Sequence, residues 1–304
     1  VKDPQDYNEA ETREFIIDQY LKEMNWNLEA PNVKEFDVVG MPSNSGDGRV
    51  DYVLWGKDGK PLAVVEAKKT TISAKSGRQQ AVCYADCLEQ MFGQRPLIYY
   101  TNGYDIHFWD DCNYPPRMVQ GFLNQDEMQR LVDRRTLTQP LNNIELDTNI
   151  AGKGRPYQRL AIESVCEQFG EKKQRKSLLV MATGTGKTRT TIALVDVLMR
   201  AGWAKNILFL ADRNALVNQA KKEFSKLLPK SSPEILSSGT GALKGRLYLS
   251  TYPTMMNLLS AAPDSRLFGV GHFDLIVVDE AHRSVYKKYR YIFDYFDSLL
   301  LGLT

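Results

Sequence analysis

The sequence predicts two successive α/β domains, the second of them a doubly wound parallel sheet. In the second half of the chain, short apolar runs alternate with helical patterns, which is typical of parallel strands joined by helices. In the first half, apolar runs come in pairs around tight turn signals, with helical patterns beside them. A chain of 304 residues is long enough for two domains of ordinary size.

The first domain, expected over residues 1–110, begins with an amphipathic helix over 8–26. Early acidic residues and apolar residues at helical spacing indicate this helix. Its expected apolar face consists of Phe15, Ile16, Tyr20, Leu21 and Met24. A loop rich in Gly, Ser, Pro and Asn follows at 40–48.

Two hairpins and a helix make up the rest of this domain. Apolar runs at 50–55 and 61–68 flank a Lys-Asp-Gly-Lys turn and predict the first hairpin. Residues 76–92 predict a helix. The second hairpin, over 95–110, turns at Asn102-Gly103.

Residues 111–154 are expected to form a connector, because periodicity weakens there and Pro, Asn and Asp accumulate. A short helix over 124–134 is the exception. The second domain, 155–304, follows with strands and helices in alternation. Its strands are expected at 177–183, 206–212, 246–251 and 273–280, and its helices from Lys187 and at 214–227. The run 299–304 is typical of a buried strand, and with Val1 in place of Met we expect the sequence to be a fragment.

Composition narrows the function only slightly. A formal net charge of +2 is too mild to indicate a nucleic-acid partner, so any such partner has to be inferred from motifs. The four cysteines, Cys83, Cys87, Cys112 and Cys166, form no CxxC pair, which suits reduced thiols in a cytoplasmic protein. No apolar run approaches the ~18 residues that a transmembrane helix needs, so we expect no membrane partner.

A Gly-rich loop between an expected strand and an expected helix predicts an ATP site. The loop consists of Thr183, Gly184, Thr185, Gly186, Lys187 and Thr188. Its glycines allow backbone N–H groups to surround phosphates at the helix N-terminus, and the lysine can reach the β- and γ-phosphates. The Thr188 hydroxyl is the expected Mg²⁺ ligand. The alternative is an ordinary Gly-rich turn, because Met181 stands where the strict phosphate-loop pattern has Gly.

A second acidic motif completes this nucleotide site. Asp279 and Glu280 follow a buried apolar run, at the carboxyl end of a strand, where ligands bind in parallel sheets. Asp279 can hold Mg²⁺, and Glu280 can orient or deprotonate the attacking water. Acids that merely cap the next helix are the alternative. The two motifs together predict a nucleotide hydrolase.

The first hairpin predicts a second metal site. With the turn centred between Asp58 and Gly59, opposing positions place Asp51 opposite Glu66 and Gly56 opposite Pro61. Opposed side chains have Cβ atoms about 5 Å apart, which is repulsive for two carboxylates unless a cation lies between them. Mg²⁺ would relieve the repulsion, with the carbonyl of Ala67 as a further ligand. Lys68, on the face of Glu66, could then act on the attacking water and on phosphate charge.

Residues 155–304 resemble the first motor domain of superfamily 2 helicases and translocases, a RecA-like domain. The match consists of ATGTGKT at 182–188, DEAH at 279–282, RPYQ at 155–158, LADRNALVNQ at 210–219 and STYPTM at 250–255. The resemblance implies that Gln158 reads adenine and that Arg213 and Thr251 lie near the nucleic-acid backbone. The family's second RecA-like domain, with its transition-state arginines, does not follow the terminal LGLT. We therefore expect weak or no ATP turnover by this chain alone.

The first domain resembles the PD-(D/E)xK nucleases of the RecB-like branch, with a restriction-endonuclease-like fold. Asp51, Glu66-Ala67-Lys68 and the Q-x-x-x-Y motif at Gln80 and Tyr84 carry the resemblance. Gln80 and Tyr84 are four residues apart, hence on one helix face, and the resemblance assigns them to DNA positioning.

Structural alternatives to these nuclease assignments remain open. Asp51 and Glu66 could lie on a solvated hairpin face, because E-x-K occurs often by chance. Gln80 could be a surface side chain and Tyr84 a half-buried one. Glu11 could be an additional acid at the metal, although a first-turn helix charge is the simpler interpretation.

The whole chain resembles the N-terminal part of the restriction (R, HsdR) subunit of type I restriction-modification enzymes. This resemblance rests on the nuclease motifs, on the DEAH motor and on NEAETR near the start. It implies ATP-dependent translocation and cleavage of double-stranded DNA, together with methyltransferase and specificity subunits. Two alternatives are a repair or defence nuclease-helicase without those subunits, and a non-catalytic DNA-binding module. The intact acidic and lysine residues disfavour the binding module.

Overall fold

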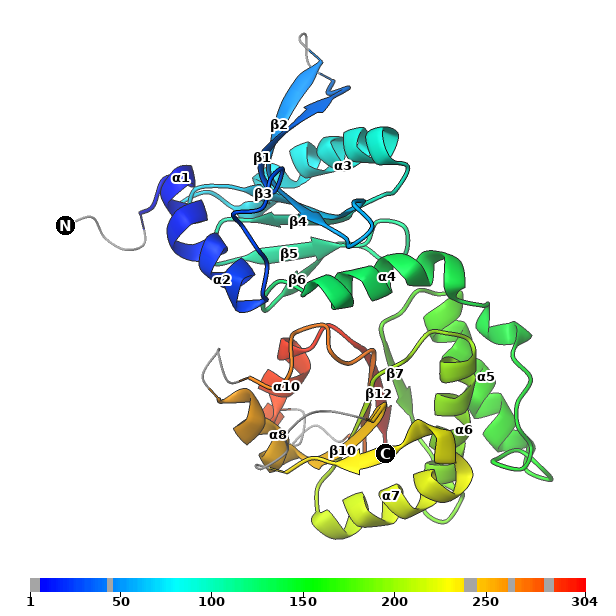
Figure 1. Cartoon of the computed structure of the whole chain (residues 1–304). Coiled ribbons are helices and arrows are strands. Elements are labelled where there is room, and N and C mark those ends of the chain that lie inside the picture. The colour runs from blue at the N-terminus through cyan, green and yellow to red at the C-terminus, as the bar shows by residue number, and fades with distance from the viewer. Residues whose placement is uncertain (1–5, 43–45, 238–244, 262–265, 282–286) are drawn as a thin grey trace. The chain divides into compact units, whose positions relative to one another are not determined.

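The computed structural model describes residues 6–42, 46–237, 245–261, 266–281 and 287–304. The chain divides into two units, Val1–Thr136 and Leu137–Thr304 (Figure 1). Within the described residues, each unit contains one six-stranded sheet flanked by helices, as predicted for two α/β domains. None of the helices in these ranges is both long and apolar enough to cross a membrane.

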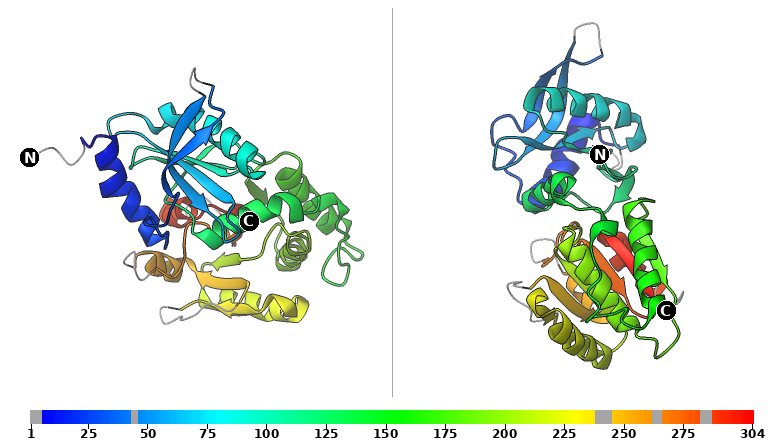
Figure 2. Two further views of the ribbon diagram at one scale, coloured as in Figure 1. Left: turned by 45° about the horizontal axis from the view of Figure 1, so that its top comes forward. Right: turned by 90° about the vertical axis from the view of Figure 1, so that its right-hand side faces the viewer.

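The first unit is built on a mixed sheet with the order β1-β2-β3-β4-β5-β6. Its elements are α1 (Glu9–Thr12), η1 (Arg13–Ile17), α2 (Asp18–Glu23), β1 (Lys34–Val39), β2 (Asp47–Trp55), β3 (Pro61–Ala67), η2 (Ala74–Gly77), α3 (Arg78–Phe92), β4 (Leu97–Thr101), β5 (Ile106–Trp109), β6 (Arg117–Val119) and α4 (Gln125–Leu137). Strands β3 and β4 are parallel, and the other neighbours are antiparallel. Helix α3 covers one face of the sheet, and α2 and α4 cover the other (Figure 2). Val64 belongs to the hydrophobic cluster that includes α3, whereas Val65 belongs to the cluster that includes α2 and α4.

The N-terminal helix is interrupted by a π-helical turn, η1, between α1 and α2. Leu21 is fully buried, as expected, and so is Ile17, which the expected face did not include. Phe15 and Tyr20 are instead exposed by 52% and 37%. The expected apolar face is therefore wrong in part. The reason is that a π turn contains more residues than an α turn and so rotates the faces of the helix on either side of it.

The first hairpin has the predicted register near the site and a different one near its turn. Tyr52 pairs with Val65 and Leu54 with Ala63, as the sequence predicted. An irregularity then follows, and Trp55 pairs with Pro61. The predicted pairing of Gly56 with Pro61 is wrong, because β3 has one additional residue, Leu62, between the partners of Leu54 and Trp55, and this shifts the register by one position.

The second predicted hairpin is confirmed as β4 and β5, with Thr101 paired to Ile106. Asn102 shapes the turn, because its Oδ1 accepts hydrogen bonds from the N–H groups of Tyr104 and Asp105. Of the residues expected as a connector, β6 and most of α4 belong to the first unit, and the short helix η3 (Leu141–Asn143) belongs to the second.

The second unit is a doubly wound parallel sheet, as predicted, with the order β7-β12-β11-β8-β10-β9. Its further elements are α5 (Pro156–Gly170), β7 (Lys176–Leu179), α6 (Lys187–Arg200), β8 (Ile207–Ala211), α7 (Asn214–Leu227), η4 (Pro229–Ser231), β9 (Pro233–Ile235), β10 (Leu247–Thr251), α8 (Tyr252–Leu259), β11 (Leu275–Val278), α10 (Arg290–Tyr295) and β12 (Leu299–Leu303). All pairs of neighbouring strands are parallel. The expected strand at 299–304 is therefore confirmed as β12.

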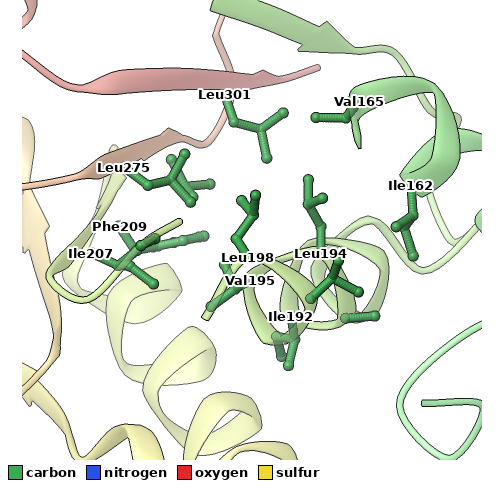
Figure 3. Close-up of a cluster of buried hydrophobic side chains, with 14 of the residues drawn as sticks. Ile162, Val165, Ile192, Leu194, Val195, Leu198, Ile207, Phe209, Leu275 and Leu301 are labelled. Carbon is green, nitrogen blue, oxygen red and sulfur yellow. The ribbon is translucent and has the colours of Figure 1, made fainter. Parts of the chain in front are cut away.

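Side chains along these strands alternate between the two faces of the sheet and pack into two separate hydrophobic cores. Phe209, Leu275 and Leu301 point toward Leu194 and Leu198 of α6 (Figure 3). The intervening strand residues pack instead against α8 and α10 on the other face. Because all strands run in the same direction, the segments that follow β7, β8, β10 and β11 emerge at one edge of the sheet, where the predicted nucleotide and DNA residues lie.

Candidate functional site

The two carboxylates of the predicted nuclease site lie on adjacent strands. The observed pairing of Tyr52 with Val65, continued by one position, places Asp51 of β2 opposite Glu66 of β3. Both side chains are buried, and Glu66 is only 2% exposed. Asp51 Oδ2 accepts a 2.7 Å hydrogen bond from the N–H of Ala67, which orients this carboxylate toward β3. The solvated hairpin face that was the alternative is therefore not what the structure shows.

Lys68 connects this pair to the following helix. Its Nζ lies 2.5 Å from Glu66 Oε1 and 3.1 Å from Gln80 Oε1. Gln80 Nε2 in turn donates a 2.8 Å hydrogen bond to the hydroxyl of Tyr84. The predicted nuclease residues thus form one continuous hydrogen-bonded group between β3 and α3.

Gly77, at the junction of η2 and α3, allows this close approach. A Cβ atom at Gly77 would lie 3.0 Å from Glu66 Cγ and 3.3 Å from Lys68 Cε, both tighter than ordinary contacts. The start of α3 therefore packs directly on the side chains of Glu66 and Lys68, and this contact restricts where they can move.

The site contains two buried acids, Asp51 and Glu66, beside two cations, Arg13 and Lys68. Burial and the nearby negative charge of Asp51 raise the pKa of Glu66 to about 7, although the hydrogen bond from Lys68 opposes this rise. Burial alone would lower the pKa of Lys68, but the hydrogen bond to Glu66 and the charges of Glu66, Glu9 and Asp51 together raise that pKa. Paired carboxylate oxygens in such surroundings are a donor set that fits Mg²⁺, so these residues are compatible with the predicted metal.

Sequence reasoning missed the N-terminal residues that reach this site. Arg13 Nη1 lies 2.8 Å from Asp51 Oδ1, a contact across 38 positions that no local pattern indicates. Burial, Asp51 and Lys68 have the largest effects on the pKa of Glu66, and the charge of Glu9 raises this pKa further. Glu11 instead accepts a hydrogen bond from the N–H of Asn8 and closes a helix capping box, in agreement with its interpretation as a helix charge.

A further acidic cluster in the first unit is held by arginines. Among the residues that the structure describes, Asp110, Asp111 and Cys112 are the group of three metal-ligand types that lie close together. Arg135 Nη2 lies 2.7 Å from Asp110, and Arg95 Nη2 lies 2.6 Å from Asp111. These ion pairs account for the cluster, which joins α4 to the end of β5.

The second unit contains the predicted phosphate loop between β7 and α6. Gly184 and Gly186 have positive φ angles of 77° and 91°, the conformation that glycine adopts most readily. Thr185 Oγ1 donates to the carbonyl of Ala182 and closes the turn. Lys187 and Thr188 are the first residues of α6, at the positive end of its helix dipole. Thr183 is exposed at the start of the loop.

Gln158 is buried against this loop. Its Nε2 donates a 2.9 Å hydrogen bond to the carbonyl of Thr185, and its Oε1 accepts one from the N–H of Gly152. A Cβ atom at Gly186 would lie 2.6 Å from Gln158 Nε2, so only glycine fits there without displacing this amide. Gln158 therefore touches the phosphate loop directly, and the hydroxyl of Tyr157 also donates to the carbonyl of Thr185.

Asp279 and Glu280 follow β11 and meet the phosphate loop. Lys187 Nζ lies 3.6 Å from Glu280 Oε1, so the two motifs that the sequence assigned to one site are together. Burial and the charge of Glu280 raise the pKa of Asp279. Glu280 has a φ of 53°, an uncommon conformation for a residue with a side chain. His282, the last residue of DEAH, lies outside the described residues.

The two predicted DNA residues of this unit lie at the same edge of the sheet. Arg213 precedes α7 and is exposed, with its Nε 3.3 Å from Asp212. Thr251 ends β10, and its hydroxyl accepts a hydrogen bond from the N–H of Thr254, which caps α8.

Two family models match the chain. The model described as "Type III restriction enzyme, res subunit" matches residues 151–304, and the model described as "Type I restriction enzyme R protein N terminus" matches residues 33–117. The first match covers the phosphate loop and both acids of the motor. The second covers Asp51, Glu66, Lys68 and the Q-x-x-x-Y motif.

Curated relatives of the chain are endonuclease subunits of type I restriction enzymes. The EcoAI subunit of Escherichia coli is 33% identical over 273 residues, which are 84% of this chain and 32% of that protein. The EcoKI subunit of Escherichia coli strain K12 is 25% identical over 391 residues, covering 98% of this chain and 32% of that protein. The chain therefore spans about a third of the length of these relatives.

Solved structures with weaker similarity include a fragment of a putative HsdR subunit from Vibrio vulnificus YJ016, with a TM-score of 0.39 and 24% identity over 98% of this chain and 55% of that one. The SWI2/SNF2 ATPase core of Sulfolobus solfataricus gives a TM-score of 0.40 at 21% identity, over 56% of this chain and 33% of that one. Because one family model covers half of the sequence, the chain belongs to the restriction-enzyme res-subunit family, in the form found in the R (HsdR) subunits of type I restriction enzymes.

Proposed function

We propose that this chain provides the nuclease domain and a motor domain of a type I restriction subunit, which cleaves DNA with Mg²⁺ and couples cleavage to ATP-dependent translocation. One observation carries the nuclease assignment. Asp51, Glu66 and Lys68 meet in one buried group, joined through Gln80 to Tyr84. Two buried acids opposite one another are unfavourable unless cations lie beside them. Arg13 and Lys68 supply two such cations, and a bound divalent cation would stabilise the pair further.

Each nuclease residue has a distinct proposed role. Asp51, Glu66 and the carbonyl of Ala67 would hold Mg²⁺, which supplies a Lewis acid for phosphodiester cleavage. Lys68 keeps its proton, stabilises charge on phosphate oxygens and orients the attacking water. Gln80 fixes the position of the Lys68 ammonium group through its 3.1 Å contact, and we assign Gln80 and Tyr84 to the DNA-facing side of the domain.

The motor residues are proposed to bind ATP and Mg²⁺. Bound ATP supplies the free energy for translocation, and backbone N–H groups of the loop Thr183, Gly184, Thr185 and Gly186 would bind its phosphates. Lys187 would bind the β- and γ-phosphates. Thr188 and Asp279 would ligate Mg²⁺, and Glu280 would orient water. Gln158 would contact adenine while it holds the loop through Thr185. Arg213 and Thr251 would face the DNA backbone.

The relatives support the proposed partners. Since they are named as type I restriction endonuclease subunits, we infer double-stranded DNA as the substrate and methyltransferase and specificity subunits as the partners of this chain, in the cytoplasm. We also propose that the nuclease residues lie within 1–110 and the motor residues within 155–304; of the predicted connector 111–154, β6 and most of α4 extend the first unit.

Replacement of Lys68 by Ala tests the nuclease assignment. In the complete restriction enzyme reconstituted with ATP and Mg²⁺, we expect Lys68→Ala to reduce the rate of double-strand cleavage by about 10²-fold or more, the usual range for loss of such a group. Cleavage is measured on supercoiled plasmid, and ATP hydrolysis is measured in parallel.

The neighbouring Lys69, whose side chain is exposed, supplies the matched control. Lys69→Ala should cleave like the wild type, and both variants should hydrolyse ATP normally. Equal cleavage by the Lys68→Ala and wild-type enzymes would refute the nuclease site.

A further inference from the structure

Arg13 forms a fork between two acids on neighbouring strands. Its Nη1 lies 2.8 Å from Asp51 Oδ1, and its Nη2 lies 2.8 Å from Glu35 Oε1. The side chain of Arg13 is 24% exposed and that of Glu35 is 49% exposed, so the fork lies at the rim of the buried site. Asp51 is thereby held on both sides, by Ala67 N–H at Oδ2 and by Arg13 at Oδ1.

The register of the sheet places three acids in one row. Lys34 pairs with Tyr52 and Phe36 with Val50, so Glu35 lies between these pairs, level with Asp51. Glu66 lies level with Asp51 on the other side, by continuation of the β2 and β3 pairing. The row therefore crosses β1, β2 and β3, with Arg13 between the first two acids and Lys68 at the third.

Glu35 has an unusual backbone conformation, and Arg13 begins a π-helical turn. Glu35 has a φ of 53°, in the left-handed region that residues with a side chain rarely occupy. Arg13 is the first residue of the π-helical turn η1. Such strained positions and π turns cluster at functional sites, and they persist where surrounding contacts stabilise them. Here the contact that links the two is the ion pair itself.

The charges of Arg13 and Glu35 cancel beside the site. Burial alone would lower the pKa of Arg13, but its hydrogen bond to Glu35 and the charge of Asp51 raise it. The hydrogen bond from Arg13 lowers the pKa of Glu35. Both groups therefore stay ionised at neutral pH. Asp51 receives a strong hydrogen bond from a pair whose net charge is zero, so the donor adds little repulsion toward a divalent cation.

We propose that Arg13 and Glu35 form a positioning pair that holds the Asp51 carboxylate in line with Glu66, so that the two carboxylates can share one divalent cation. This inference rests on the metal site of the proposed nuclease function. Arg13 acts through Asp51, as other groups that hydrogen-bond metal-ligating carboxylates do. Glu35 keeps Arg13 from acting as an uncompensated cation beside the metal.

A charge-neutral double variant, Arg13→Met with Glu35→Gln, tests the pair. The double change removes one positive and one negative charge, so that only the orientation of Asp51 is altered. Binding of Mn²⁺, an oxygen-seeking probe of the same class as Mg²⁺, is titrated calorimetrically on the whole chain without nucleotide. We expect affinity to fall by about 10- to 100-fold, the range seen for groups that support metal ligands.

Lys57→Met with Asp126→Asn is the matched control, because this exposed pair, 3.0 Å apart, lies in the same unit and touches none of the site acids. We expect it to bind Mn²⁺ like the wild type. Glu35→Gln alone should also weaken Mn²⁺ binding, because Arg13 then remains as an uncompensated charge. Asp51→Asn identifies the part of the signal that belongs to the nuclease site.

Three outcomes separate the possibilities. Wild-type Mn²⁺ affinity in the double variant would overturn the positioning role. If the unfolding temperature without metal is then lower than that of the wild type, the pair is merely structural. If Asp51→Asn binds Mn²⁺ like the wild type, the metal site itself is wrong, and the proposed nuclease function fails with it. Loss in the double variant and in Asp51→Asn, but not in the control, is the expected result.

Discussion

At the scale of single residues, Glu66 is a buried carboxylate with a raised pKa and a proposed metal ligand. It is 2% exposed, and burial together with the charge of Asp51 raises its pKa to about 7. A carboxylate with such a pKa is protonated in part at neutral pH, and a metal ligand must be deprotonated. We therefore expect metal affinity at this site to increase as pH rises through about 7.

The same shift makes stability depend on pH. At low pH, Glu66 is protonated in both the folded and the unfolded chain. Between pH 4.5 and about 7 only the folded chain keeps the proton, so the free energy of unfolding falls as pH rises. A rise in pKa from 4.5 to about 7 corresponds to about 3 kcal/mol, at roughly 1.4 kcal/mol for each unit.

Glu66→Gln should remove this dependence. Without metal, we expect the variant to gain stability relative to the wild type as pH increases from about 5 to about 8, by about 3 kcal/mol over the whole window. Urea denaturation in the presence of a chelator measures the difference. Glu29→Gln, at an exposed position, should follow the wild type at every pH. Parallel curves for Glu66→Gln and the wild type would contradict the raised pKa.

The sequence could predict that Asp51 and Glu66 lie together, but not that Arg13 and Glu35 lie beside them. The two-residue period of strands and one turn signal were sufficient to place Asp51 opposite Glu66. Arg13 and Glu35 could not be found in this way, because the contact of Arg13 with Asp51 spans 38 positions and the strand that contains Glu35 was not predicted. The left-handed φ of Glu35 is uncommon for a residue with a side chain, so no propensity predicts it.

At the scale of elements, the junction of η2 and α3 packs against the side chains of Glu66 and Lys68. Helix α3 follows the loop after β3, and Gly77 brings its first turn against Glu66 and Lys68. The helix was predicted from its apolar spacing, whereas the register error near Pro61 and the rotated face of the first helix arose from an irregular pair and a π turn. Such single-residue insertions leave no periodic signal.

Gly77→Ala should disturb the site while the fold is kept. Gly77 has a φ of −80° and a ψ of −8°, which alanine adopts easily, so the backbone accepts the change. The added methyl would press on Glu66 Cγ and Lys68 Cε, and we expect the cleavage rate of the complete enzyme to fall by about 10-fold. Gly170→Ala, which meets no atom closer than 3.7 Å, is the control and should cleave normally. Wild-type cleavage by Gly77→Ala would show that the contact is not restrictive.

At the scale of the whole molecule, the residues of the two proposed sites lie in two separate units. The metal-site residues lie within Val1–Thr136, and the phosphate loop and its acids lie within Leu137–Thr304. Asp51 and Glu66 lie on the neighbouring strands β2 and β3, whereas the phosphate loop follows β7 and the two motor acids follow β11, with β12 between these strands. Each set of residues forms a recognisable motif, which is why the sequence predicted both sites. No motif describes how the proposed ATP hydrolysis would be coupled to the proposed cleavage, so this coupling has to be tested by experiment.

Replacement of Lys187 by Ala tests whether DNA cleavage depends on ATP hydrolysis while metal binding at Asp51 is kept. Lys187 begins α6 and contacts Glu280, so its loss should lower ATP hydrolysis by the complete enzyme by about 10²-fold or more. Affinity for Mn²⁺ at Asp51 should be unchanged, because that site lies in the other unit. DNA cleavage should nevertheless disappear if translocation must precede it. The exposed Lys205→Ala is the control and should match the wild type in all three measurements. Cleavage without ATP hydrolysis would mean that the nuclease acts independently of the motor, whereas unchanged ATP hydrolysis would refute the role of the phosphate loop.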